Sequence, residues 1–362
     1  MFVQKILRIA ATAFALAESE LAAAELFRLF PEPVAAVQFT LAGDSRSRLF
    51  RPNTFGFLDT DEASLSGIPI RWDPEPRETT IYLNPQRAPA PQTFWAGVIS
   101  LAAMTGSALN SFDDGPNEKY HFTSERWFQS DTYVGGGDKA SHFVSYNIVS
   151  KELAIIYQGL GYSPKQSRLM GFAVSTFTGL VTELGDGRGQ YGFSYEDFLS
   201  DAAGAASGAL IAAYDLDDLI GFRAGVMRAP STPKQDSVDG LGKDYSREIY
   251  TADLKLVGLA RRARIDPGLA RYLLFSTTYG VKGYPYALPE FRQRQIGFEI
   301  GLNLGQVVWD LGVGNDSWWG IALHFVFDNI RLPYTAIGYR YDLNHGQWHG
   351  PDSGNGFSFS TP

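Results

Sequence analysis

The stretch Gly137-Asp138-Lys139-Ala140-Ser141-His142-Phe143 opens a run of three expected helices that reaches residue 215. Asp138 and His142 are four residues apart, so a helix places them on one face. Small or acidic residues recur at this spacing in the next two helices, at Gly171, Ser175, Gly179 and Glu183, and at Asp197, Asp201, Gly204 and Gly208. Small residues at such a spacing allow helices to approach closely. We therefore expect the three faces to meet.

Start and stop signals bound these helices. Residues 138–158 end at Gly159, where glycine can close a helix in the left-handed conformation. Ser163 is an N-cap followed by Pro164 in the first turn, and this helix runs to about residue 184. Ser194 caps the next helix, which ends near residue 214. Ahead of them, residues 94–109 carry no charge and predict a helix at the lower edge of bilayer-spanning length, for which we favour a buried position.

The pattern changes after Asp215 from a period near four to a period near two. Alternating or β-rich segments lie between glycine, proline and aspartate turns, at 219–228, 248–260, 270–281, 292–304, 319–327 and 334–343. They predict about five or six antiparallel strands. The expected fold class is α+β: a small helical bundle with Gly/Ala-rich helix contacts, followed by an antiparallel β-sheet or a small barrel-like sheet.

Composition divides the chain into five segments. Residues 1–29 predict a signal peptide or an amphipathic helix, because Lys5 and Arg8 precede a short apolar stretch. Prolines interrupt residues 30–92, which predict an irregular lead-in. A helical core module at 93–215 and an antiparallel β module at 216–343 follow. Residues 344–362 contain glycines between their histidines and predict a flexible tail.

Charge and cysteine content exclude some classes of function. The formal net charge of −8 and the absence of a Lys/Arg cluster argue against nucleic acid as a partner. The chain has no cysteine, which excludes disulfides, thiolate metal sites and a lipid-bearing N-terminal cysteine. Aromatic residues make up 14%, which fits exposed β surfaces or a membrane interface as well as a core.

Separated motifs give the chain a family resemblance. In the helical half they are Phe122 through Trp127, Asp138-Lys139-Ala140-Ser141-His142, Glu183 with Asp186-Gly187, Tyr191 through Asp197, Asp201 and Gly204. In the second half they are Asp244-Tyr245, Tyr250, Arg292 through Gln295 and Leu302-Asn303-Leu304. With these motifs the chain from His121 to about Val308 resembles the uncharacterised YfiM-like predicted periplasmic lipoproteins of bacteria. A fainter similarity to VanZ-like membrane proteins rests on part of the helical set.

The resemblance implies a location in the cell envelope, in the periplasm or at the outer membrane. It also implies a membrane or another envelope component as partner, whereas protein partners stay open. The family has no established activity to carry over. This chain departs from the lipoprotein members because it has no cysteine to acylate.

The ionisable residues of the helical faces have structural interpretations. Asp138 follows glycines as an N-cap does, and Asp197 follows Ser194 by three residues, as in a capping box. Glu183 ends a helix, where the macrodipole disfavours a negative charge. We therefore expect it to have a partner, and the candidates are Lys139, Arg168, Arg188 and His142. Asp201 lies in mid-helix, where an unpaired carboxylate is costly and pairing with His142 would remove most of the cost.

Three functional interpretations stay open. The first is a non-catalytic, membrane-associated envelope protein in which a polar helical core organises a β platform. The second is a hydrolase of an envelope lipid or glycan with His142 as general base. Its catalytic residues would be Asp138, His142, Glu183 and Asp201, and its substrate-binding residues Lys139, Asp186 and Asp197. The third is a divalent-metal site of His142, Glu183 and Asp201, which has few nitrogen ligands for zinc. No dinucleotide, P-loop or nucleophile-elbow motif occurs, and we expect no other cofactor.

Overall fold

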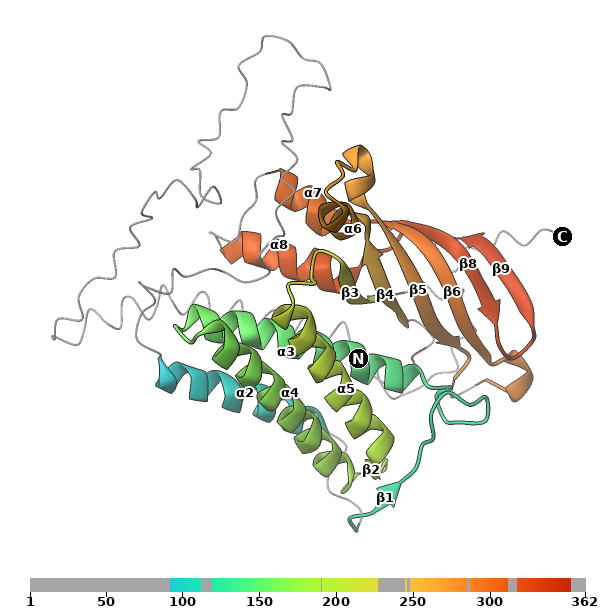
Figure 1. The fold of residues 1–362 in the computed structure, drawn as a ribbon. Helices are drawn as coiled ribbons and strands as arrows, with labels where there is room; N and C mark the ends of the chain where they lie inside the picture. The colour runs from blue at the N-terminus through green and yellow to red at the C-terminus, as the bar shows by residue number, and fades with distance from the viewer. Residues whose placement is uncertain are drawn as a thin grey trace, which may run out of the picture.

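The fold combines a helical bundle with a sheet, as the sequence predicted (Figure 1). The computed structural model describes residues 92–111, 119–189, 191–226, 245, 248–284, 287–311 and 318–352. The expected signal or amphipathic helix at 1–29, and the Pro-rich lead-in at 30–92 except its last residue, lie outside the described residues. The α+β fold class is confirmed.

Four helices form the bundle: α2 (Thr93–Ser111), α3 (Gly137–Gly159), α4 (Pro164–Asp186) and α5 (Tyr195–Ala213). The sequence predicted each of them within a few residues, because caps mark the starts of α4 and α5, glycines flank α3, and an uncharged apolar run marks α2. Ser163 and Gln166 form a capping box at α4, with Pro164 in the first turn. At α5, Ser194 Oγ accepts a hydrogen bond from the backbone amide of Asp197.

Small residues bring the helices of the bundle into close contact. A Cβ atom at Gly204 or Gly208 of α5 would overlap backbone carbonyl oxygens of α3, those of Phe143 and Asn147 respectively. Gly171 of α4 lies equally close to the backbone of α3. These contacts confirm the predicted meeting of the three helical faces and the Gly/Ala-rich packing between them.

Helix α2 packs on the bundle through one side only. Ala96 is buried against Leu153 and Tyr157, whereas Phe94 and Leu101 are exposed. The expectation of a fully buried helix was therefore wrong for those two positions. None of the helices in the described part of the chain has the length and apolarity needed to cross a bilayer.

The main sheet contains the strands β3 (Ile220–Val226), β4 (Glu248–Lys255), β5 (Leu273–Lys282), β6 (Gln293–Leu302), β7 (Ile330–Arg331), β8 (Ala336–Asp342) and β9 (Gln347–Asp352). Their order is β7-β3-β4-β5-β6-β8-β9. All neighbours are antiparallel except β3 and β7, which are parallel. A second, small parallel sheet joins β1 (Phe122–Thr123) to β2 (Phe193–Ser194).

Two predictions for the second half were wrong. Residues 319–327, expected as a strand, belong to helix α8 (Trp318–Asn329), because a short apolar run without alternation fits a helix as well as a strand. Part of the expected flexible tail is ordered as β9, which pairs with β8. Short helices also interrupt the β module: α6 (Leu256–Ala263), α7 (Leu304–Asp310), η2 (Gly268–Tyr272) and η3 (Pro289–Phe291).

The two faces of the sheet differ sharply in polarity. On one face Arg223 contacts Asp253 through two hydrogen bonds, of 2.5 and 3.2 Å. On the same face Arg331 contacts Glu299 through two, of 2.6 and 2.8 Å, and all four of these side chains are buried. The opposite face carries large apolar side chains, many of them exposed: Leu254, Phe275, Ile296, Phe298, Ile300, Leu302, Ile337, Tyr339 and Trp348. We call this set the apolar sheet face.

The polar face lies on the inside of a curved sheet. Arg331 is on β7 and Glu299 on β6, four strand positions apart, or about 19 Å in a flat sheet with strands 4.8 Å apart. Their contact requires the sheet to curve around the polar face. Helix α3 packs on the other face, over β3 and β4, where Val144 and Ile148 contact Ala224 and Tyr250 (Figure 1). The apolar sheet face continues from this contact towards β9.

Candidate functional site

The polar centre of the bundle is built around a histidine–aspartate pair. His142 Nδ1 of α3 lies 2.7 Å from Asp201 Oδ1 of α5. Gly204, one turn beyond Asp201, allows α5 to approach α3 this closely. Burial alone would lower the pKa of His142, but the charges of Asp201, Asp197 and Glu183 and the hydrogen bond to Asp201 raise it to about 10. The predicted pairing of these two residues is therefore found.

Glu183 approaches the same histidine from α4. Its side chain is buried, and its Oε2 accepts a 3.0 Å hydrogen bond from the Ser194 backbone amide. Burial raises the pKa of Glu183 to about 9, and nearby acids add to this shift while His142 opposes it. Of the partners expected for Glu183, His142 is the one that influences its pKa, and Arg168 instead donates to the Ala212 carbonyl.

Lys139 neutralises a second group of acids beside the histidine. Its Nζ lies 2.7 Å from Glu125, 2.6 Å from Asp138 and 2.9 Å from Asp197. Burial raises the pKa of Asp138 to about 6, although the Lys139 charge opposes the shift. The prediction that Asp138 is the N-cap of α3 was wrong, because the N-cap is Gly136, with φ of 82°. Asp138 Oδ1 accepts a 2.8 Å hydrogen bond from the Lys139 backbone amide in the first turn. Asp138 instead holds Lys139.

The capping-box interpretation of Asp197 was half right. Ser194 Oγ accepts from the Asp197 backbone amide, but the Ser194 amide donates to Glu183 Oε2 rather than to the Asp197 side chain. The Asp197 carboxylate therefore contacts Lys139 and lies close to His142 and Glu183. Glu183 of α4 accepts the Ser194 amide in place of the Asp197 side chain. The local spacing of Ser194 and Asp197 does not reveal this partner from another helix.

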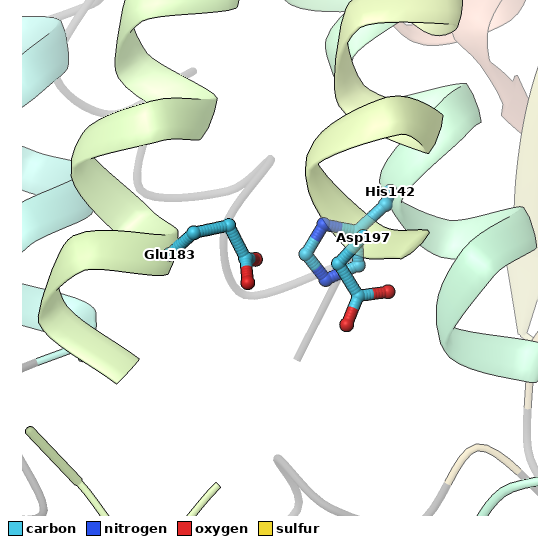
Figure 2. Close-up of side chains that lie close together, drawn as sticks. All are labelled: His142, Glu183 and Asp197. Atoms are coloured by element: carbon cyan, nitrogen blue, oxygen red, sulfur yellow. The ribbon is translucent and has the colours of Figure 1, made fainter. Parts of the chain in front are cut away.

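Three side chains from three helices converge at this point. Potential ligand atoms of His142, Glu183 and Asp197 all lie within 4.8 Å of one another, and Figure 2 shows the Glu183 carboxylate directed towards the histidine ring. The predicted metal set had Asp201 in place of Asp197. Asp201 binds Nδ1 of the ring instead, so it orients His142, and the geometry offers Asp197 as the third ligand.

The remaining predicted residue, Asp186, lies at the end of α4, and its charge contributes to the raised pKa of Glu183. It is not among the three converging side chains. Sequence reasoning missed Glu125, Tyr146 and Thr182. Tyr146 stacks beside His142, and its hydroxyl lies 2.9 Å from Thr182 Oγ1. The position of Tyr146 four residues after His142 was the available signal for it. Glu125 lies within the Phe122 through Trp127 motif, which gave the family resemblance but no role for this residue.

Chemically, the site combines an accessible imidazole with buried carboxylates. The His142 side chain is 15% exposed, while that of Asp201 is completely buried. The arrangement fits an imidazole that an acid orients for proton transfer, or a cation bound by one nitrogen and carboxylate oxygens.

Part of this chain is similar to one protein family. No curated protein matches the sequence, and no solved structure matches it. A family model described as "Predicted periplasmic lipoprotein (DUF2279)" matches residues 124–213, about a quarter of the chain. We expected the resemblance to reach Val308, but the match ends before the sheet, and it confirms neither the YfiM-like name nor the VanZ-like similarity. The matched segment holds every residue of the polar centre, and its similarity to predicted periplasmic lipoproteins supports a cell-envelope protein of unknown function.

Proposed function

We propose that the protein is a non-catalytic, membrane-associated component of the cell envelope, and that its apolar sheet face contacts lipid. The observation that carries this proposal is the inverted polarity of the sheet. Charged residues are buried and paired on the concave face, whereas large apolar residues are exposed on the convex one. In water the opposite distribution is the stable one.

The apolar sheet face is continuous across neighbouring strands. Ile300 of β6 lies between Phe275 of β5 and Ile337 of β8 in register. One row further along, Phe298 contacts the rings of Tyr339 and Trp348. From Ile296 to Leu302 the face extends for about 20 Å at roughly 3.3 Å per residue. Exposed apolar patches of this kind mark protein–protein or membrane contacts.

Two features favour lipid over a protein partner. The central rows of this face, from Ile296 to Leu302 on β6 and their neighbours on β5 and β8, contain no charged side chain, whereas protein interfaces carry a polar rim with about ten hydrogen bonds. Tyrosine and tryptophan gather at its β8–β9 edge, as is common where a protein meets the lipid headgroups. The family similarity supports an envelope location independently of the sheet.

Flotation with lipid vesicles tests the proposal. The full chain is mixed with phosphatidylethanolamine–phosphatidylglycerol vesicles and centrifuged through a density gradient. We expect it to float, and we expect a Phe298→Asp/Ile300→Asp variant to partition at least about tenfold less, because burying one such side chain is worth about 1.5–3 kcal/mol. Leu169→Asp, which adds a charge at an exposed leucine of α4, is the matched control and should float like the wild type.

A wild-type chain that stays at the bottom of the gradient contradicts the proposal. So does a Phe298→Asp/Ile300→Asp variant that floats as well as the wild type. If the wild type fails to float and light scattering shows a dimer that the same variant dissociates, the face is covered by a second copy of the chain and not by lipid.

One observation favours a second candidate function, hydrolysis of an envelope lipid or glycan. The 2.7 Å contact between His142 Nδ1 and Asp201 leaves Nε2 of a partly exposed ring for proton transfer. Turnover of ester or glycoside probes that is lost in both His142→Gln and Asp201→Asn would support it. Turnover that survives both substitutions, or none with any probe, would leave the non-catalytic proposal in place.

A further inference from the structure

The triangle of His142, Glu183 and Asp197 lies on three different helices. Their potential ligand atoms are within 4.8 Å of one another, and three ligands each about 2.1 Å from one ion lie at most about 3.6 Å apart. Side-chain rotations that move these atoms by about an ångström would bring all three to an ion. The three helices pack closely, through glycines, so their backbones hold the three side chains in place.

A buried oxygen of Glu183 that has no hydrogen-bond partner in the described part of the chain is an independent sign of a ligand site. Its side chain is 1% exposed, and its Oε2 is satisfied by the Ser194 amide. Its Oε1 is buried without a hydrogen-bond partner among the described residues. Buried carboxylate oxygens ordinarily have such partners, and Figure 2 shows this carboxylate directed at His142.

A neighbouring group of acids has a lysine at its centre, which neutralises their charge. Potential ligand atoms of Glu125, Asp138 and Asp197 also lie within 4.8 Å of one another, but Lys139 Nζ occupies their centre. Asp197 belongs to both groups. Its Oδ1 lies 2.9 Å from Lys139 Nζ, and one of its carboxylate oxygens lies within 4.8 Å of potential ligand atoms of His142 and Glu183. Within the described residues, no lysine or arginine forms an ion pair with Glu183.

We propose that His142 Nε2, Glu183 and Asp197 bind a divalent first-row transition-metal ion, with Asp201 as the positioning residue. Asp201 accepts the Nδ1 hydrogen of His142 and so presents the Nε2 lone pair, the arrangement by which a carboxylate usually orients a metal-binding histidine. One imidazole nitrogen selects zinc, manganese or iron over calcium and magnesium, which take oxygen ligands. The exposed edge of His142 gives the ion access from solvent.

This inference does not depend on lipid binding, because the helical site and the apolar sheet face are separate parts of the molecule. Calorimetric titration of the full chain, first stripped with a chelator, with Zn²⁺ or Mn²⁺ tests it. We expect one ion per chain. Glu183→Gln and Asp197→Asn should weaken binding more than tenfold, and Asp201→Asn about 10–100-fold, the usual effect of losing a partner behind a metal-binding histidine. Asp131→Asn, which removes a charge from an exposed acid, should bind like the wild type.

A second measurement needs no variant and so does not depend on the variants folding. Pulsed electron paramagnetic resonance of the wild-type chain with Mn²⁺ should show coupling to one imidazole nitrogen. Absence of stoichiometric binding overturns the proposal, as does binding without nitrogen coupling, or binding that Glu183→Gln and Asp197→Asn leave at wild-type strength.

Discussion

Lys139 shows how one side chain can stabilise a group of buried acids. It is 1% exposed and lies between carboxylates of a loop, of its own helix and of α5. Burial alone would lower its pKa, but the charges of Asp138, Asp197 and Glu125 raise it above the ordinary value for lysine. The ammonium group therefore stays charged and ties these three parts of the chain together.

Replacing Lys139 with methionine should destabilise the fold strongly. The substitution keeps the volume but leaves three carboxylates buried together, and breaking a buried ion pair in this way costs about 3–5 kcal/mol. Urea unfolding followed by circular dichroism measures the difference. Lys165→Met removes an exposed lysine of α4 and should change the free energy of unfolding by less than about 0.5 kcal/mol. Equal effects of the two substitutions would contradict the role of Lys139.

At the residue scale, the sequence predicted one pair of the site and misread others. His142 and Asp201 were predictable because a mid-helix carboxylate needs a partner, and a histidine lay on the facing stripe. Asp138 and Asp197 were misread as local caps, since glycine caps α3 and Glu183 accepts the Ser194 amide. Glu125 could not be predicted, because its place beside Lys139 depends on a loop whose path the local sequence does not determine.

At the scale of elements, the glycines of α5 set its distance from α3. A Cβ at Gly204 would overlap the Phe143 carbonyl oxygen, which is backbone and cannot move aside without shifting α3. Gly204→Ala should therefore lower the free energy of unfolding by about 1–3 kcal/mol, despite the better helix propensity of alanine.

The matched control is Gly97→Ala in α2. A Cβ there meets no atom within 4 Å, so alanine should raise the stability by about 0.5–1 kcal/mol. Opposite signs for the two substitutions in the same denaturation assay support the packing described. A stabilising effect at position 204 would show that α3 and α5 are farther apart.

The turn between β8 and β9 contains a titratable contact. His345 Nδ1 lies 2.7 Å from the buried Asp342 carboxylate, and this hydrogen bond, with one from His345 Nε2 to the Glu290 backbone carbonyl, raises the pKa of His345 above its usual 6.5. Since the folded pKa is the higher one, the stabilisation is complete below the unfolded pKa of about 6.5 and is lost as the pH rises through the folded pKa.

Nuclear magnetic resonance titration of the His345 ring should therefore give a midpoint above 6.5, and Asp342→Asn should lower it. An unchanged midpoint in Asp342→Asn would show that the pair does not form. This contact also explains why the predicted flexible tail was wrong in part: glycines at 346 and 350 suggested disorder, but pairing with β8 and contact of Trp348 with Tyr341 hold β9.

Other elements were predictable wherever their signals were local. Caps and glycines bounded the bundle helices, and strict alternation identified β6. Helix α8 was missed because its apolar run has no period that separates a helix from a strand. The parallel contact of β7 with β3 joins residues more than one hundred positions apart, which no local pattern could show.

At the scale of the whole molecule, the helical bundle and the sheet each enclose a polar cluster, and the two parts contact each other through apolar side chains. The bundle encloses the His142 and Lys139 clusters, and the curved sheet encloses paired arginines and acids. Helix α3 covers the convex face of the sheet over β3, β4 and part of β5, and Phe325 of α8 packs on the same side. The apolar sheet face beyond this contact is exposed, and we propose that lipid covers it.

Site-directed spin labelling tests this claim most directly, because the chain has no cysteine of its own. A nitroxide is attached to Ile300→Cys, at the centre of the apolar sheet face, and separately to Lys165→Cys, at an exposed position on α4. With vesicles present, the label at 300 should be relaxed more by oxygen, which concentrates in lipid, than by a water-soluble nickel chelate, and the label at 165 should show the reverse. A label at 300 that is relaxed mainly by the nickel chelate would contradict the account.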